Sequence, residues 1–388
     1  MSGIYIHIPF CRQACTYCDF YFETSLKHRA GFVPQLLREI AHTQAQFPET
    51  TAEPVKTLYF GGGTPSRLTT PEIAEIIARI RQGWTLEPGA EITLEMNPDD
   101  VHPGRLAELR QAGITRVSMG VQTFDEARLR FMNRAHTRGE ALRALEALAG
   151  AGLPSWTADL IYGNPGQTLD ELRADLETLL QFQPPHVSAY SLTVEENTKL
   201  YRMVKKQLVQ PPDDEEVAEQ MQLVTDTLGA AGIARYEVSN YARPGHESRH
   251  NGAYWRHENY LGFGPGAHGF WWQPGGQGAE RTQNAPRLRT YMDADPGIAF
   301  HRIQTDSYDL AALGEERLLL GLRTRSGVSR EELLSRYGCG LTEAQLSTAA
   351  KFTAQDLLDD VAQTGLLRLT QKGLLFANRI GLELVSVK

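Results

Sequence analysis

No stretch of the 388-residue chain approaches the roughly 18 consecutive apolar residues that a membrane-spanning helix needs. The first ten residues also lack a basic leader followed by an apolar segment and a small-residue cleavage site. We therefore expect a cytoplasmic protein that does not span a membrane. Positive charge is scarce too, because 39 Lys and Arg residues face 47 Asp and Glu residues. The net charge of −8 would repel a phosphate backbone, which argues against nucleic acid as a partner.

Cysteine is the next scarce residue, with only four in the chain. Cys11, Cys15 and Cys18 lie within eight residues of one another, and Cys339 lies in a distant segment. This spacing does not resemble a disulfide framework. It favours a metal site in a reducing compartment.

Short β-branched runs alternate with helical patterns through the first two thirds of the chain. Strands are predicted at 4–8, 55–60, 91–96, 116–121, 157–162 and 187–192. Helices are predicted at 34–46, 71–81, 103–112, 138–149, 169–180 and 213–231. Alternation of this kind predicts a parallel sheet, with chemistry at the carboxyl ends of its strands. Six units in place of eight predict an α/β fold with an incomplete (βα)6 barrel, open on one side.

We expect three regions along the chain. Residues 1–232 form the partial barrel, and residues 233–300 form an aromatic and glycine-rich, β-containing segment that extends it. Residues 301–388 form a small C-terminal α+β domain of winged-helix type. Its helices are predicted at 313–323, 329–337 and 342–358, followed by a β-hairpin at Gln371-Lys372-Gly373.

The three clustered cysteines offer thiolates that can each bind one corner iron of a cubane cluster. The fourth iron would then lack a protein ligand and could accept a chelating small molecule, as open metal sites do. Two alternatives remain at this point: a zinc site completed by His7, or free thiols without metal.

The Cys-x-x-x-Cys-x-x-Cys pattern after the first strand resembles the signature of the radical S-adenosylmethionine (SAM) superfamily. The run Gly61-Gly62-Gly63-Thr64-Pro65 after the second strand resembles that family's glycine motif, which lets the backbone approach the cofactor. The resemblance implies a 4Fe-4S cluster on Cys11, Cys15 and Cys18, with SAM on its open iron. It also implies an electron donor, because the cluster reduces the sulfonium by one electron to give a 5′-deoxyadenosyl radical.

The resemblance is closest to the oxygen-independent coproporphyrinogen oxidase group and extends over nearly the entire chain. It implies that the matching residues contact SAM; these are Tyr5, Tyr17, Gly62, Gly63, Thr64, Glu95, Gln122, Arg134 and Asp159.

Two features separate the branches of that group. The oxidase branch has a further cysteine two residues after the third cluster cysteine, whereas Asp19 and Phe20 follow Cys18 here. Residues 250–255, His-Asn-Gly-Ala-Tyr-Trp, match the His-Asn-x-x-Tyr-Trp motif of the HemW haem-chaperone branch. The resemblance therefore implies a protein that binds haem and delivers it to acceptor haemoproteins, including respiratory and membrane-associated ones. An oxygen-independent coproporphyrinogen III dehydrogenase is the alternative.

Imidazole is a common haem ligand, so we predict that His250 binds the haem iron while Tyr254 and Trp255 pack on the porphyrin. The competing interpretation is that these aromatic residues form a protein core in which His250 bonds a neighbour. Nearby arginines could pair haem propionates or simply form a solvated edge; they are Arg243, Arg249 and Arg256. The second axial ligand stays open among His136, His186, His246, His257 and His268. Cys339 is interpreted as a small hydrophobe and not as a ligand.

Overall fold

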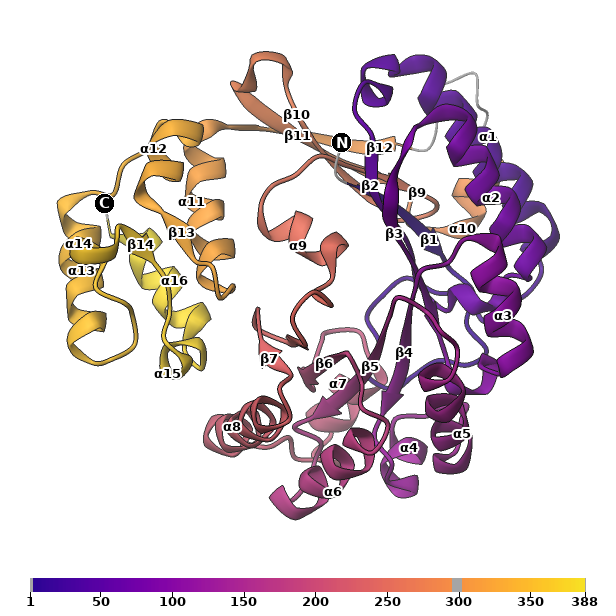
Figure 1. The fold of residues 1–388 in the computed structure, drawn as a ribbon, viewed down its shortest axis with the longest axis horizontal. Helices are drawn as coiled ribbons and strands as arrows, with labels where there is room; N and C mark the ends of the chain where they lie inside the picture. Colours follow the sequence, from indigo (N-terminus) through magenta and orange to yellow (C-terminus); the bar gives the residue numbers. More distant parts are fainter. Residues whose placement is uncertain (1–2, 295–301, 388) are drawn as a thin grey trace.

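Six parallel strands follow one another across the sheet in chain order (Figure 1). They are β1 (Gly3–Ile8), β2 (Val55–Gly62), β3 (Leu86–Met96), β4 (Arg116–Gln122), β5 (Ser155–Tyr162) and β6 (His186–Ser191). The computed structural model describes residues 3–294 and 302–387. Each predicted strand is present, and the predicted six-unit α/β arrangement is confirmed.

Helices cover the outer face of these strands (Figure 1). They are α1 (Arg29–Gln46), α2 (Thr70–Gly83), α3 (Pro103–Ala112), α4 (Glu126–Phe131), α5 (Arg138–Ala149), α6 (Leu169–Leu180) and α8 (Asp214–Ala230). The short helix α7 (Lys199–Lys205) follows β6 and contacts residue 16 in the loop after β1. Capping boxes fix the starts of α2, α5, α6 and α8, in which an N-cap side chain and a Glu three residues later satisfy each other's backbone N–H groups.

The six strands have one apolar and one polar face. Side chains alternate across a strand, so Ile4, Ile6 and Ile8 join the buried core while Tyr5 and His7 point the other way. The same alternation puts polar side chains on the inner face of each of the five remaining barrel strands, β2 to β6; they include Thr57, Glu95, Ser118, Asp159 and Ser188. The barrel lumen is therefore polar, and the hydrophobic core lies between sheet and helices.

The sheet continues beyond the six-stranded barrel on both sides. β9 (Tyr260–Phe263) pairs in parallel with β1, and β10 (His268–Trp272), β11 (Gly278–Asn284) and β12 (Arg302–Asp309) extend it antiparallel. β8 (Asn240–Ala242) and β7 (Ala234–Arg235) extend the other edge beyond β6. The 12-stranded sheet ends at β12 and β7 without closing. The remaining elements of this region are α9 (Arg249–Trp255) and α10 (Leu288–Asp293).

The C-terminal residues pack around a second hydrophobic cluster. They form α11 (Leu310–Leu322), α12 (Arg330–Tyr337), α13 (Glu343–Ala354), α14 (Val361–Thr364), α15 (Gln371–Leu374) and α16 (Ala377–Ser386), with β13 (Val328–Ser329) paired antiparallel to β14 (Leu366–Leu367).

The hairpin predicted at Gln371-Lys372-Gly373 is wrong. The Thr370 hydroxyl accepts a hydrogen bond from Gly373 N at 3.0 Å and starts the helical turn α15. Gly373 is needed for packing, since a Cβ there would lie 1.8 Å from Leu357 O. The winged-helix assignment and the three-domain division stay predictions, and the boundary between residues 300 and 301 lies outside the described residues. Across 3–294 and 302–387, none of the helices combines the length and apolar character needed to cross a bilayer.

Candidate functional site

The three clustered cysteines lie on residues 9–18, which we call the cysteine loop, directly after β1. All three are half-buried. The Thr64 hydroxyl donates to Cys11 Sγ at 3.5 Å, and Arg134 Nη1 donates to Cys15 Sγ at 3.4 Å. Polar donors at these sulfurs are suited to thiolates.

No group of three or more His, Cys, Asp or Glu side chains in the described ranges meets the geometry of a single bound metal ion. A cubane cluster does not require that geometry, because each cysteine binds a different iron. Burial raises the pKa of Cys11 and raises that of Cys18 to about 12, so both are thiols until a metal displaces their protons.

The glycine motif at the end of β2 is packed too tightly for any other residue. Gly62 has a φ of 112°, and a Cβ there would lie 2.7 Å from the His7 ring. A Cβ on Gly63 would lie 3.0 Å from Cys11 Sγ and 2.9 Å from the Pro9 carbonyl carbon. The motif thus brings bare backbone to the cysteine loop, as expected for a cofactor cradle.

A continuous polar network links this cradle to β3 and β4. Asn97 Nδ2 donates to the Thr64 hydroxyl at 3.4 Å, and Arg134 Nη2 donates to Asn97 Oδ1 at 2.8 Å and to Gly120 O at 2.9 Å. Gln122 closes β4 with a φ of 69° beside a register shift in its pairing with β5. Gln122 Oε1 and Arg134 Nε are buried and lack a hydrogen-bond partner in the described chain. Such orphaned atoms fit a site built to take a polar ligand.

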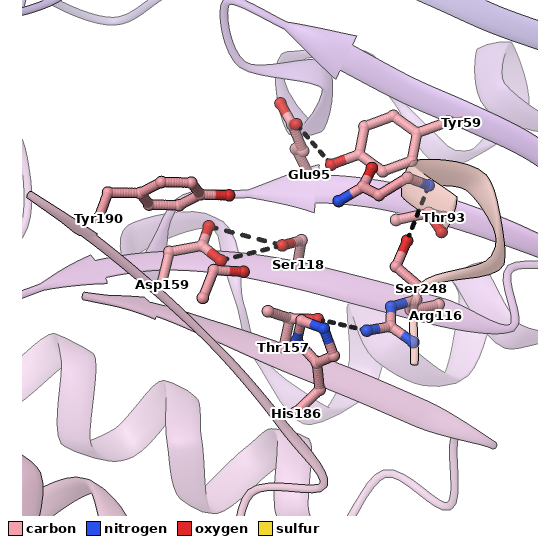
Figure 2. A pocket seen from close by; sticks show the side chains of 12 residues that line it. Tyr59, Thr93, Glu95, Arg116, Ser118, Thr157, Asp159, His186, Tyr190 and Ser248 are labelled. Atoms are coloured by element: carbon pink, nitrogen blue, oxygen red, sulfur yellow. Dashed lines mark hydrogen bonds between the residues drawn. The ribbon is translucent and has the colours of Figure 1, made fainter. Parts of the chain in front are cut away.

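Two half-buried carboxylates stand further inside the lumen (Figure 2). Tyr59 OH donates to Glu95 Oε1 at 2.7 Å, and Ser118 OH donates to Asp159 Oδ1 at 3.2 Å. Burial raises the pKa of Glu95 to about 7 and that of Asp159 to about 6. Both groups therefore titrate close to neutral pH, which is typical of functional carboxylates.

The structure brings some of the predicted SAM residues together near the cysteine loop, whereas Asp159 lies further inside the lumen beside Ser118. Tyr17 hydrogen-bonds Arg134, and Tyr5 packs beside Glu95 where both approach Gly61. The prediction omitted Tyr59, Ser118 and Asn97, which hold the predicted residues in place. The alternation of polar residues along each strand was the signal that could have identified Tyr59 and Ser118.

One polar cavity in the lumen has a volume of about 50 Å³. Figure 2 shows its wall, which includes Glu95, Asp159, Arg116, His186 and Ser248. This volume holds a few water molecules and is far below the roughly 300–1,000 Å³ of pockets for drug-sized ligands. A tetrapyrrole does not fit there in this conformation.

Helix α9, which contains the His-Asn-x-x-Tyr-Trp motif, closes the opposite end of the lumen. Its first backbone N–H groups, of Arg249 and His250, donate to Glu91 at 3.2 and 3.0 Å. Glu91 in turn lies 3.6 Å from the Arg116 guanidinium, the first residue of β4. The motif therefore sits at the amino ends of the strands, whereas the cysteines sit beyond the carboxyl end of β1.

His250 is enclosed by the protein in this conformation. Its ring is 1% exposed, with Nδ1 2.7 Å from the Thr57 hydroxyl and Nε2 2.8 Å from Tyr254 OH. The ring stacks on Tyr59 at 4.9 Å, and burial lowers its pKa to about 3. Both ring nitrogens thus have protein partners in this conformation, as the competing interpretation of a histidine bonded to its neighbours expects, and His250 as the haem-iron ligand stays a prediction. Trp255 is half-buried, and its Nε1 has no partner among the described residues.

The other residues considered for haem binding differ in their exposure and in their ion pairs. His136, His186 and His257 are buried, His246 is half-buried, and His268 is exposed. Arg249 and Arg256 pair with Glu87 and Glu258, while Arg243 is half-buried. Cys339 packs against Gly314 of α11, where a Cβ would meet its sulfur, in keeping with its interpretation as a small core residue.

Comparison with known proteins gives the family. The Radical SAM superfamily model matches residues 5–179. The heme chaperone HemW of Bacillus subtilis is 34% identical over 98% of this chain and 98% of its own length. The chain belongs to the HemW family. A second member, the heme chaperone HemW of Mycobacterium tuberculosis, is 36% identical over 97% of this chain and 93% of its own.

This HemW-family chain also shares its fold with a solved structure. The coproporphyrinogen III oxidase HemN of Escherichia coli, a radical SAM enzyme, superposes with a TM-score of 0.83 over 99% of this chain and 90% of that one. The identity is 21%, so this likeness speaks for the fold alone. The resemblance predicted from the cysteine loop and the His250 motif is confirmed at the level of the family.

Proposed function

We propose that this chain is a haem chaperone of the HemW type, which binds haem and delivers it to acceptor haemoproteins in the cytoplasm or at a membrane. The observation that carries the proposal is the extent of the likeness to HemW chaperones. At 34–36% identity, the alignments cover 97–98% of this chain and 93–98% of the two chaperones. Phe20, 67% exposed, occupies the place of the oxidase branch's extra cysteine.

The proposed cofactors are a 4Fe-4S cluster on Cys11, Cys15 and Cys18, and SAM. When bound, the cluster supplies one electron to the sulfonium of SAM. The protein's part is to bind and orient. The bare backbone at Gly62 and Gly63 would admit the cofactor's amino group, Arg134 would pair with its carboxylate, and Glu95 would accept hydrogen bonds from its ribose hydroxyls. The other proposed SAM residues complete the site; they are Tyr5, Tyr17, Thr64, Gln122 and Asp159.

We propose α9 as the haem-binding element, with His250 as iron ligand and Tyr254 and Trp255 against the porphyrin. The described conformation is then the closed form. Binding requires the Thr57–His250 and His250–Tyr254 hydrogen bonds to break and α9 to separate from the barrel. The alternative is a coproporphyrinogen III dehydrogenase, and the resemblance disfavours it because Phe20 stands where that branch has its further cysteine.

The test is haem titration and coproporphyrinogen turnover measured on one cluster-replete sample. We expect a Soret band that saturates at one haem per chain and no stoichiometric decarboxylation under anaerobic reducing conditions. His250→Ala should weaken haem binding, whereas His246→Ala, a half-buried histidine outside the motif, should not. Stoichiometric decarboxylation would overturn the chaperone proposal. Equal haem binding by His250→Ala and the parent would overturn the assignment of His250 as the iron ligand.

A further inference from the structure

Helix α7 is joined to the cysteine loop through the protein backbone. Leu200 N donates to Thr16 O at 2.8 Å, and the Leu200 side chain is 1% exposed on the helix's inner face. Thr16 immediately follows Cys15, so the first turn of α7 is one residue away from a proposed cluster ligand. Thr16 N also donates to Met132 O at 3.0 Å, at the end of α4. The loop is thus fixed between two helix ends.

The outer face of α7 is basic. Its spacing of three and four residues puts four cations on the side opposite Leu200. All are exposed, and none forms an ion pair within the described ranges; they are Lys199, Arg202, Lys205 and Lys206, which we call the α7 basic face. Residues 199–206 contain no acid, and only Glu195 and Glu196 precede the helix closely. Leu208, 70% exposed, follows directly.

This face is unusual for the chain, whose net charge is −8. Four cations that form no ion pair with the described residues, beside an exposed leucine, would steer an acidic protein toward the surface that covers the cysteine loop. A helix is about 10–12 Å across, so a protein docked on the outer face lies about one helix away from the loop.

We propose that the α7 basic face docks an acidic one-electron carrier protein that reduces the cluster. The inference rests on the proposed cluster. In the step itself the carrier loses one electron and the cluster gains one, and no bond forms or breaks. Electron-transfer encounters are small and weak, and complementary charge supplies most of their speed and orientation. A short row of exposed lysines and arginines with one apolar contact suits such an encounter.

The test uses anaerobic stopped-flow mixing of the cluster-replete protein with reduced flavodoxin, an acidic flavoprotein. The variant Arg202→Glu/Lys205→Glu reverses two charges on the α7 basic face. Lys351→Glu/Lys372→Glu reverses two exposed charges in the C-terminal region and is the matched control. We expect the second-order rate of cluster bleaching to fall about tenfold or more in the α7 variant, and to stay within about twofold in the control. Added salt should slow the parent and leave the α7 variant nearly unchanged.

Two further measurements separate docking from damage. Dithionite, a small reductant, should reduce parent and α7 variant at equal rates, and their iron content should match. Binding of oxidised flavodoxin to the metal-free protein, measured by calorimetry, should weaken about tenfold in the α7 variant. Equal flavodoxin rates, or equal binding, in the α7 variant and control overturn the inference. So does binding to phosphatidylserine vesicles in place of flavodoxin. Absence of iron from the reconstituted parent would instead overturn the proposed cluster, while the calorimetry still decides the docking.

Discussion

The substitution Thr57→Val tests whether His250 must leave its pocket to bind haem. Thr57 Oγ1 lies 2.7 Å from His250 Nδ1, and Thr57 is 1% exposed. Valine keeps the shape of the side chain but leaves the buried imidazole nitrogen without a partner, which costs about 1–3 kcal/mol. That cost falls on the closed conformation alone. If closed protein predominates and only the open form binds haem, the apparent Kd should fall by about 5- to 150-fold.

The assay is haem titration followed by the Soret band, with urea unfolding of the same samples. Thr57→Val should bind haem more tightly while its free energy of unfolding falls by about 1–3 kcal/mol. Thr93→Val is the control, because Thr93 is also 1% exposed in the adjacent strand and its hydroxyl has no partner among the described residues. Unchanged or weaker haem binding by a folded Thr57→Val would refute the idea that His250 leaves its pocket to bind haem. If His250 has only a structural role, removing its hydrogen bond to Thr57 should not raise the affinity for haem.

Three further predictions concern the lumen. Gly62→Ala should weaken SAM binding in equilibrium dialysis by about tenfold or more, because its φ is 112° and its Cβ would strike His7; Gly89→Ala, at a φ of 73° with open space around it, should not. SAM affinity should rise as pH increases through about 7, where Glu95 ionises, and Glu95→Gln should flatten that profile. Burial lowers the pKa of His250 from 6.5 to about 3, so the stability that the neutral ring contributes above pH 6.5 is lost as the pH falls toward 3. Between pH 7 and pH 5 this histidine should lower the free energy of unfolding of the parent by about 2 kcal/mol. Urea unfolding of His250→Gln should show a decrease that is smaller by this amount.

The barrel was predictable because its signals are local. Apolar runs bounded by helical patterns located all six strands, and residues at the carboxyl ends of parallel strands necessarily converge. Cys11 and Gly62 could therefore be placed together from sequence alone. The helix starts followed from short-range capping chemistry, as at Thr69 and Glu72.

The environment of His250 was not predictable from the sequence. Thr57 is 193 residues away, and Glu91, which receives the His250 backbone N–H, is 159 residues away. No periodicity indicates such pairings. The error at Gln371-Lys372-Gly373 has a similar origin, because Gly373 serves a close approach to Leu357 and not a hairpin turn. In both cases a tertiary contact outweighs the local pattern.

The position of the two motifs at opposite ends of one lumen bears on how SAM could influence haem. Tyr5 and Tyr59 would each lie 2.9 Å from a Cβ on Gly61, at the cofactor cradle. The same rings stack near His250, at 6.4 and 4.9 Å between centroids. Packed interiors do not absorb displacement gradually, so a ligand that moves these rings at one end changes the fit of the histidine at the other. Linkage then requires reciprocity: whatever factor SAM imposes on haem affinity, haem must impose on SAM affinity.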